Sequence, residues 1–328
     1  DTCDDCSNGS YDTDSECNFD IDVDLHAGAN LISFHALPDD VSVENIFDGA
    51  DGVIGQGVGA VNINGTWIGS LTEVDQDDGY WVKVTEATTL SLTNAEPVNY
   101  DADGEVVYSI SYGNNLISYS FGNGQGLEDG LGEAAGSVYA IAGEGVAALA
   151  INGVFVGSLT TFEGGSGYWL VATADFEFSF NGVDEGLTRE QLMPRVSEVY
   201  SYRQSDQQAF FFVSTATIHG KALESDDILI AYNGDVVVGS RYWNGELTDI
   251  PALGVDSEGT EMFAGYCEAG DKVSFKVLDA STGELVDMDA AGDIEWNTMD
   301  ISVINLTDRF LPVEVSLSNA YPNPFNPS

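Results

Sequence analysis

The chain has 328 residues, of which 55 are acidic and nine are basic, so its formal net charge is -46 at pH 7. Nucleic acids and anionic membranes are bound through clusters of Lys and Arg, and this composition excludes both as partners. Hydrophobic residues make up 43% of the chain and aromatic residues 11%, which excludes an acidic disordered polymer and is enough to bury sizeable cores.

The first 24 residues form a segment rich in Asp, Ser and Asn. Cys3, Cys6 and Cys17 lie in this segment, and the fourth cysteine, Cys267, lies far along the chain. Disulfide bonds are the usual staple of such a segment in an oxidising compartment, so we expect these four cysteines to form them, with the pairing left open. A zinc site is the alternative, since Cys3 and Cys6 have the spacing of zinc ligands, although no second pair follows nearby.

Three segments of the chain occur twice in the same order, the second copy lying 85 or 88 residues after the first. They are Gly28–Phe34 with Gly113–Tyr119, Ile63–Leu71 with Ile151–Leu159, and Gly79–Val82 with Gly167–Leu170. Ordered repetition at one period indicates homologous structural units. The sequence therefore predicts two tandem β-modules, at residues 25–98 and 99–184.

Each module has the pattern of β-structure. The pairs Asn64-Gly65 and Asn152-Gly153, each between alternating apolar residues, predict tight hairpins. Short helices are expected only at residues 43–47 and 127–134. The modules resemble the repeats with the sequences NLIS and GYWV that occur in exported bacterial proteins, and this resemblance implies no catalytic role for those residues.

The modules contain a set of aromatic residues that admits two interpretations. The set consists of Trp67, Trp81 and Trp169 with Tyr80 and Tyr168. Exposed rings would form stacking platforms for sugars, whereas buried rings would pack in the core. Because Gly-Tyr-Trp recurs at one structural position, we expect core packing.

A third domain is predicted at residues 185–312, beginning with a helix over Thr188–Met193 that has a capping box. Strand patterns follow at residues 209–213, 227–232, 236–239 and 272–278, and the pair Asn233-Gly234 predicts a hairpin turn. The fold class expected for the whole chain is all-β, with the two modules followed by an antiparallel β-sandwich.

Residues with catalytic potential do not form a recognisable motif. His26, His35 and His219 are far apart in the sequence, and no Ser or Cys stands in a nucleophile motif. The glycines at 55, 57 and 59 lack the lysine of a phosphate-binding loop, so we expect a turn. Carboxylates are so abundant that pairs of them carry no information on glycosidase chemistry. We therefore expect no enzymatic activity, and a secreted hydrolase ranks third among the functions considered.

Calcium is the cofactor that the sequence suggests, because hard cations take several oxygen ligands from closely spaced carboxylates. The candidate ligands are Asp287, Asp289 and Asp293, then Asp20, Asp22 and Asp24, with further sets at Asp75, Asp77 and Asp78 and at Asp101 and Asp103. None of these sets completes an EF-hand loop. The alternative is that each set belongs to a solvated turn, because closely spaced aspartates occur by chance in so acidic a chain.

The residues 313–328 form an extended tail that ends in a specific order of Pro, Asn and aromatic residues. It contains Tyr321, Pro322, Asn323, Pro324, Phe325, Asn326 and Pro327. This motif resembles the start of the C-terminal sorting domain of type IX secretion substrates of the Bacteroidota. The resemblance implies an extracellular or cell-surface protein, although the chain stops where the β-sandwich of that domain would begin.

We therefore expect an extracellular, non-enzymatic structural protein. It would be a subunit of a surface layer or filament, or an adhesin stalk, and its partners would be further copies of itself or other cell-surface components. The alternative is a secreted carbohydrate-binding module that recognises a polysaccharide.

Overall fold

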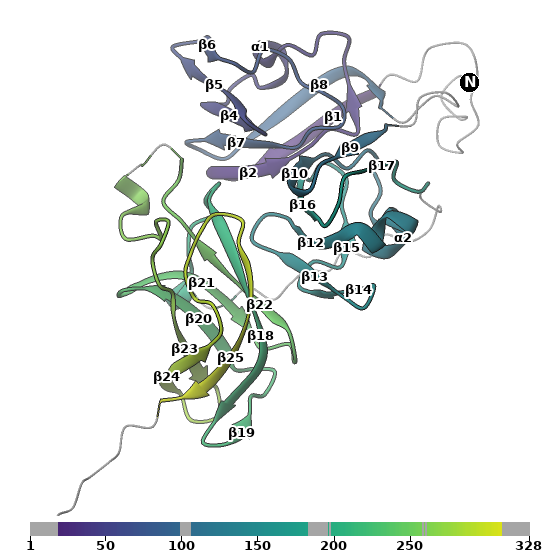
Figure 1. Cartoon of the computed structure of the whole chain (residues 1–328). Helices are drawn as coiled ribbons and strands as arrows, with labels where there is room; N and C mark the ends of the chain where they lie inside the picture. Colours follow the sequence, from purple (N-terminus) through teal and green to yellow (C-terminus); the bar gives the residue numbers. More distant parts are fainter. Residues whose placement is uncertain are drawn as a thin grey trace, which may run out of the picture.

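The computed structural model describes residues 19–98, 106–182, 196, 198–257, 259 and 261–309. Strands dominate these residues and the helices are short, so the predicted all-β class is confirmed (Figure 1). None of the described helices has the length and apolar character needed to cross a bilayer. We refer to residues 19–98 as module 1, to 106–182 as module 2 and to 198–309 as the sandwich.

Module 1 is built on a five-stranded antiparallel sheet with the strand order β2-β7-β4-β5-β6. Its strands are β2 (Gly28–Ile32), β4 (Gly52–Gly55), β5 (Val58–Ile63), β6 (Thr66–Gly69) and β7 (Tyr80–Val84). A second sheet consists of β1 (Phe19–Leu25), β3 (Ala36–Leu37) and β8 (Thr88–Pro97). Helix α1 (Val43–Ile46) contributes to the core between the two sheets, which contains Phe34, Phe47 and Tyr80.

Strand β1 lies partly within the segment 1–24 that we expected to precede the module. Along β1 the apolar residues Ile21, Val23 and Leu25 alternate with exposed aspartates. This period of two is the signature of a strand with one buried face, and the acidic composition of the segment had obscured it.

Module 2 repeats the main sheet of module 1 with the equivalent strand order β10-β16-β12-β13-β14. Its strands are β10 (Gly113–Ile117), β12 (Val138–Ala142), β13 (Ala147–Ile151), β14 (Val154–Gly157) and β16 (Tyr168–Ala172). Two small sheets pair β9 (Tyr108–Ile110) with β17 (Phe176–Phe178) and β11 (Gln125–Gly126) with β15 (Thr161–Phe162). The expected helical segment is α2 (Leu127–Leu131) followed by the 3-10 helix η2 (Gly132–Ser137).

The two predicted hairpins are confirmed. Asn64 and Asn152 both have φ of 53°, and the glycines that follow them both have φ of 83°. Left-handed conformations at both central positions are those of a type I′ turn, which matches the twist of the flanking strands and which Asn-Gly adopts at low cost.

The sandwich consists of one strongly curved sheet with the strand order β19-β18-β25-β24-β23-β20-β21, and β22 also pairs with β18. Its strands are β18 (Gln208–Ile218), β19 (Lys221–Ala222), β20 (Ile228–Asn233), β21 (Val236–Tyr242), β22 (Thr248–Leu253), β23 (Ser274–Asp279), β24 (Glu284–Ala291) and β25 (Ile301–Asp308). Two 3-10 helices, η3 (Glu198–Tyr200) and η4 (Glu261–Phe263), complete this unit. The helix expected at 188–193 lies outside the described residues.

The pairing within the sandwich differs from the prediction at one point, because β18 and β25 are parallel. The other pairs in this sheet are antiparallel. The first and last long strands of the unit lie side by side, and parallel neighbours need a crossover connection rather than a hairpin. No local turn signal marks such a pair, so the sequence pattern could not indicate it.

The two modules pack against each other in a reciprocal way. Ser33 N donates to the carbonyl oxygen of Gly165 at 2.9 Å, and its counterpart Ser118 N donates to that of Asp77, the counterpart of Gly165, at 3.0 Å. Reciprocal contacts between equivalent residues are the mark of an isologous, two-fold interface. The duplicated modules therefore form a pseudo-dimer within one chain.

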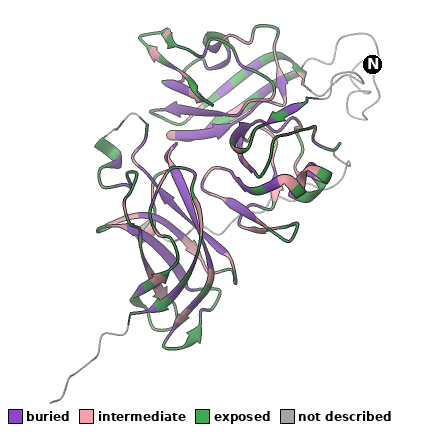
Figure 2. Cartoon of the chain, viewed as in Figure 1, coloured by how far each residue is buried: buried purple, intermediate pink, exposed green. Residues whose placement is uncertain are grey.

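Module 2 docks on the sandwich through the outer face of its main sheet. Ala140, Ala147 and Leu149 on this face pack against Phe210 and Phe212 of β18, and all five residues are almost completely buried. Figure 2 shows buried residues along the central strands of all three units, whereas the outer hairpin β5–β6 of module 1 is mostly exposed.

Candidate functional site

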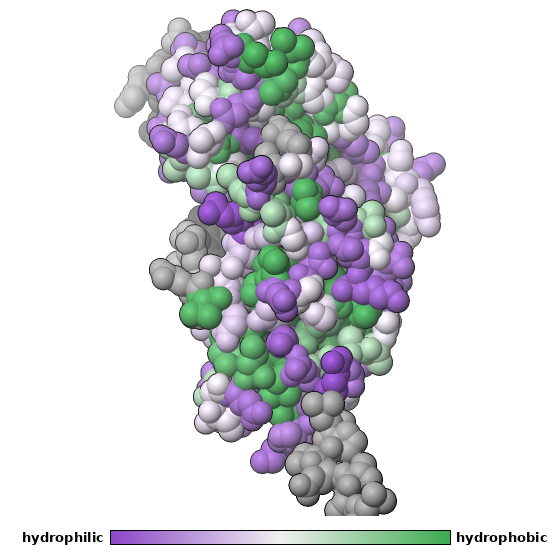
Figure 3. Space-filling model, turned by 90° about the vertical axis from the view of Figure 1, so that its left-hand side faces the viewer, coloured by the Kyte–Doolittle hydropathy of each residue, from purple (hydrophilic) through white to green (hydrophobic). Residues whose placement is uncertain are grey.

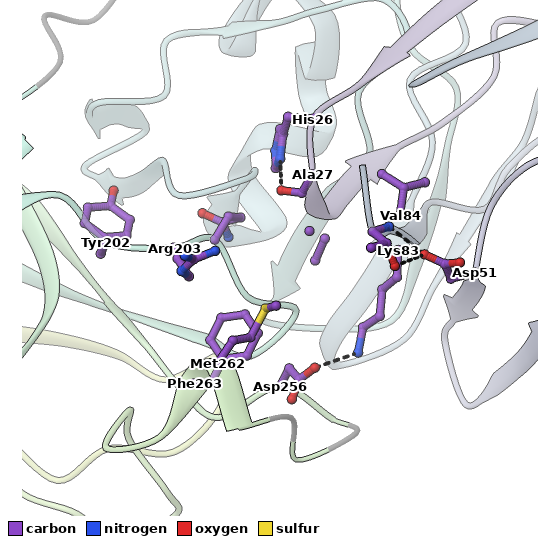
Figure 4. A pocket seen from close by; sticks show the side chains of 14 residues that line it. His26, Ala27, Asp51, Lys83, Val84, Tyr202, Arg203, Asp256, Met262 and Phe263 are labelled. Atoms are coloured by element: carbon purple, nitrogen blue, oxygen red, sulfur yellow. Dashed lines mark hydrogen bonds and ion pairs between the residues drawn. The ribbon is translucent and has the colours of Figure 1, made fainter. Parts of the chain in front are cut away.

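A cavity of about 500 Å³ lies where module 1 meets the sandwich. Its charged and polar lining includes His26, Asp51, Lys83, Arg203 and Asp256. Tyr202, Met262 and Phe263 give it an apolar wall on the side of the sandwich (Figure 4). A concave, partly apolar site with a few polar groups is the usual form of a ligand pocket.

Lys83, on the central strand β7, closes one side of this cavity. Its Nζ lies 3.3 Å from Oδ2 of Asp256 and 3.6 Å from Oδ2 of Asp206, and its side chain is only 11% exposed. Both carboxylates belong to the sandwich and are buried. A buried ammonium group needs such partners because desolvation is costly, so this contact holds module 1 to the sandwich.

The position of Lys83 also distinguishes the two modules. Lys83 pairs with Ala29 across the sheet, and the equivalent residue of module 2 is Val171, which packs against the sandwich in an apolar cluster. The same position of the same sheet therefore meets the sandwich through an ion pair in module 1 and through apolar packing in module 2.

His26 joins the two modules at the rim of the cavity. Its Nε2 lies 2.6 Å from Oε1 of Glu144, and Oε2 of Glu144 accepts a hydrogen bond from Leu31 N at 3.0 Å. In the reciprocal contact, Leu116 N donates to Oε1 of Gln56 at 2.7 Å. Glu144 replaces the glutamine of the first copy, and the carboxylate it supplies pairs with the imidazole.

A second polar cluster joins module 2 to the sandwich. Arg241 donates to Oδ2 of Asp249 at 3.0 Å and to the carbonyl oxygen of Gly145 at 2.7 Å. Asp249 also accepts hydrogen bonds from Ser158 N and Oγ. Burial raises the pKa of Asp249, although Arg241 and the Ser158 hydrogen bonds oppose that shift. Arg241 is therefore engaged in the junction between the units.

The aspartates of the candidate calcium set near the N-terminus, Asp20, Asp22 and Asp24, lie on the exposed face of β1. Asp22 Oδ1 accepts from Ser91 Oγ at 2.6 Å, Asp24 Oδ1 accepts from Thr89 Oγ1 at 2.8 Å, and Asp20 Oδ1 accepts from the backbone N of Asn94 at 3.2 Å. Each of the three carboxylates thus bonds to a different residue of strand β8.

In the candidate calcium set near the C-terminus, two aspartates form ion pairs and the third accepts a backbone hydrogen bond. Asp287 and Asp289 lie on β24, where Oδ1 of Asp287 is 3.0 Å from Lys276 Nζ and Oδ1 of Asp289 is 2.7 Å from Arg309 Nε. Asp293 accepts a hydrogen bond from the backbone of Glu295. Among the described residues, no group of three His, Cys, Asp or Glu side chains is placed to hold a metal ion. Calcium binding stays a prediction.

The set at Asp75, Asp77 and Asp78 lies at the interface between the modules, where Asp78 forms a bridge with Ile117. Burial, together with the charges of Asp77 and Asp75, raises the pKa of Asp78 to about 6. These carboxylates therefore repel one another across part of the pH range.

The cysteines and the tail can be placed only in part. Cys267 is a free, completely buried thiol in the core of the sandwich. Burial, with a smaller contribution from the charge of Asp271, raises its pKa to about 12. The predicted disulfide partners Cys3, Cys6 and Cys17, the candidate calcium ligands Asp101 and Asp103 and the whole sorting motif lie outside the described residues.

The aromatic residues of the modules are core residues, as expected. Tyr80, Trp81 and Tyr168 are at most 2% exposed, and Trp67 and Trp169 are half-buried. The hydroxyl of Tyr80 accepts a hydrogen bond from Asp75 N at 2.8 Å, and that of Tyr168 accepts one from Glu163 N at 2.7 Å. Each tyrosine thus anchors the same loop of its module, which explains why it recurs.

Sequence reasoning did not identify the cavity at the junction of module 1 and the sandwich. Lys83, Arg203 and Asp256 are far apart along the chain and carry no motif. The one available signal was their rarity, since Lys83 and Arg203 are two of only nine basic residues. Comparisons with protein-family models, curated proteins and solved structures found no match to this chain.

Proposed function

We propose that this chain is a non-enzymatic structural subunit of an extracellular assembly, exported by type IX-like secretion. The observation that carries the proposal is an exposed apolar face on module 1 whose equivalent on module 2 is partly covered by the sandwich. The resemblance of the tail to a sorting domain supports the location outside the cell.

The exposed face, which we call the β5–β6 face, consists of Val61, Ile63 and Ile68. These side chains are 40%, 50% and 55% exposed. Val61 pairs with Ile68 across the hairpin, so all three lie on one side of the sheet. Figure 3 shows apolar side chains at the module 1 end of the molecule and further apolar side chains over the sandwich.

The sandwich covers only part of the equivalent face of module 2, because Ile151, the counterpart of Ile63, is still 38% exposed. Leu149 is the counterpart of Val61, and it is 1% exposed because it packs against Phe210 and Phe212. The position of Val61 is therefore part of an interface in module 2 and open in module 1. Contiguous exposed apolar surface on a folded protein marks an interaction site.

Strand β6 also presents an open edge beside this face. The pairing of Ile63 with Thr66 closes the hairpin, so the backbone N–H of Trp67 points away from β5. In module 2 the equivalent N–H, that of Phe155, donates to Oε1 of Glu128 at 2.8 Å. Within the described residues no such partner caps Trp67. Unpaired edges are templates for adding a strand from another chain.

The occupant we propose is a second copy of this chain. Two copies that meet at β6 would continue the sheet and place their β5–β6 faces side by side, so that the apolar side chains of β6 contact each other across the joint. The ion pairs at Lys83 and Arg241 make each copy a firm unit for such an assembly. Charge repulsion opposes association, so assembly requires salt that screens it, with a Debye length of about 3 Å at 1 M.

The experiment is negative-stain electron microscopy together with light scattering at low and high salt, with and without calcium. Regular filaments, sheets or discrete oligomers are expected at high salt. Ile63→Glu should abolish them, whereas Val154→Glu, at an equally exposed site on the hairpin of module 2, should not. A monomer under all conditions would refute the proposal.

A second candidate function is polysaccharide binding, and a specific cleft favours it. A cavity of about 590 Å³ between module 2 and the sandwich is lined by Tyr242, Trp243 and Asn244. Partly exposed aromatic rings beside amide and carboxylate groups suit sugar rings. Titration with a polysaccharide panel should then quench tryptophan fluorescence, and Trp243→Ala should remove the quenching. Absence of saturable quenching for every polysaccharide would exclude this function.

A further inference from the structure

Arg203 lies in the cavity between module 1 and the sandwich, and no described residue forms an ion pair with its guanidinium. Among the described basic residues, Lys83, Arg241, Lys276 and Arg309 form ion pairs with carboxylates, whereas the exposed Lys221 and Lys272, which lie outside this cavity, do not. Arg203 forms none with any described residue, although the chain carries 55 acidic residues. An arginine kept apart from so many carboxylates is available to an anion from outside.

The backbone holds Arg203 in place at the wall of the cavity. Its N–H donates to the hydroxyl of Tyr266 at 2.8 Å, and Tyr266 is itself packed edge-on against Phe263. Figure 4 shows Arg203 beside Tyr202 and close to Met262 and Phe263, with Lys83 on the other side of the cavity. The guanidinium therefore stands next to an apolar wall.

The other charged groups of the cavity are already engaged. Lys83 pairs with Asp256, His26 lies against Glu144, and Asp51 accepts hydrogen bonds from Thr85 N and Oγ1. The free recognition element is thus a single guanidinium. Its planar fork matches a carboxylate, to which it donates two parallel hydrogen bonds.

The surroundings restrict the charge and the shape of the ligand. Asp51 and Asp256 line the same cavity, so a doubly charged phosphate would be repelled more strongly than a monocarboxylate. Met262, which is 58% exposed, and the ring of Phe263 beside it offer an apolar body a surface that it can cover from water. From the uncommitted guanidinium and this wall, we infer that the cavity binds a small organic monocarboxylate with an apolar body, through the guanidinium of Arg203.

The test is an NMR titration with 4-fluorophenylacetate, at about 0.5 M NaCl to screen the net charge. The chain contains four methionines, so labelling of the methionine methyl groups gives few signals. The signal of Met262, on the cavity wall, should shift and saturate, while those of Met288 and Met299, which are buried in other cores, should not. Acetate should bind more weakly because it lacks the apolar ring, and 4-fluorophenylacetamide should bind more weakly because it lacks the carboxylate.

Variants assign the binding to the guanidinium. Arg203→Gln should weaken the binding of 4-fluorophenylacetate roughly tenfold or more, the size expected for hydrogen bonds to a charged group, and Arg203→Lys should give an intermediate loss. Lys272→Gln, which changes the net charge equally at an exposed site, is the control and should have no effect. An unshifted Met262 signal at high ligand concentration, or equal affinity in Arg203→Gln and the control, would overturn the inference.

Discussion

The contact between Lys83 and the two carboxylates of the sandwich allows a quantitative test of how the chain is held together. In Lys83→Met the unbranched side chain keeps most of the volume of the lysine stem but removes the ammonium group. Asp206 and Asp256 are then left facing each other, with side chains only 2% and 5% exposed.

The expected cost follows from this geometry. Removing one partner of a buried ion pair destabilises a protein by about 3–5 kcal/mol, because the remaining charge stays buried without compensation. The distances of 3.3 and 3.6 Å and the residual exposure of Lys83 place the expected loss near the lower end, at about 3 kcal/mol. Replacing both aspartates by asparagine in the Lys83→Met background should restore much of it, since no uncompensated charge is then left.

The assay is urea unfolding followed by tryptophan fluorescence, with hydrogen exchange at the junction to locate the loss. The matched control is Lys276→Met, which removes the same charge from a pair whose side chains are 33% and 58% exposed. Exposed pairs contribute about 1 kcal/mol or less. If Lys83→Met costs no more than Lys276→Met, the junction does not depend on this ion pair and the reasoning is wrong.

Three further predictions concern single side chains. The folded pKa of Asp78, about 6, lies above its unfolded value, so the folded state binds more protons and stability falls as pH rises from about 4 to 6. Because Asp78 is partly exposed, Asp78→Asn should be more stable than the parent above pH 6 by only about 1 kcal/mol in urea unfolding, and an unchanged pH profile would contradict this. Gly239→Ala would place a methyl group against the carbonyl oxygen of Pro251 on β22 and should cost about 3 kcal/mol. The control Gly136→Ala, where nothing lies within 4 Å, should cost far less in the same assay. Cys267 should resist alkylation at pH 8 in the folded protein and react after unfolding without reductant, as read by mass spectrometry of its peptide, because its thiol is buried and its pKa is about 12. Labelling only after reduction would instead show a disulfide.

The features that the sequence predicted are those set by local physical rules. Asn64-Gly65 and Asn152-Gly153 form the expected hairpins because few other dipeptides accept two left-handed conformations in succession. The burial of Tyr80 and Tyr168 follows from their position on a central strand with apolar neighbours. Strand β1 was not predicted, although its apolar residues alternate with aspartates as in a strand with one buried face. The acidic composition of residues 1–24 indicated a segment without a core.

The features that the sequence did not predict depend on distant partners. Lys83 is separated from Asp206 and Asp256 by more than a hundred residues, and nothing in its local pattern distinguishes a buried, paired lysine from an exposed one. The parallel pair β18 and β25 is likewise fixed by the closure of the whole sheet. That the guanidinium of Arg203 forms no ion pair with a described residue likewise follows only from the coordinates of the charged groups around it.

Duplication of one module explains why the chain has both a closed and an open version of the same surface. The pseudo-two-fold axis gives both modules the same outer face, but the single sandwich buries the position of Leu149 in module 2 and leaves its counterpart Val61 in module 1 exposed. In module 2, Val171 and Leu149 make apolar contacts with the sandwich. The equivalent residues of module 1 are Lys83, which is charged, and Val61, which is exposed. Lys83 meets the edge of the same sandwich through ion pairs, so it fixes module 1 without covering its outer hairpin. The asymmetry therefore leaves apolar residues of the β5–β6 face exposed on a module that is already fixed to the sandwich, so under the proposed self-assembly a second copy would bind there without breaking an internal contact.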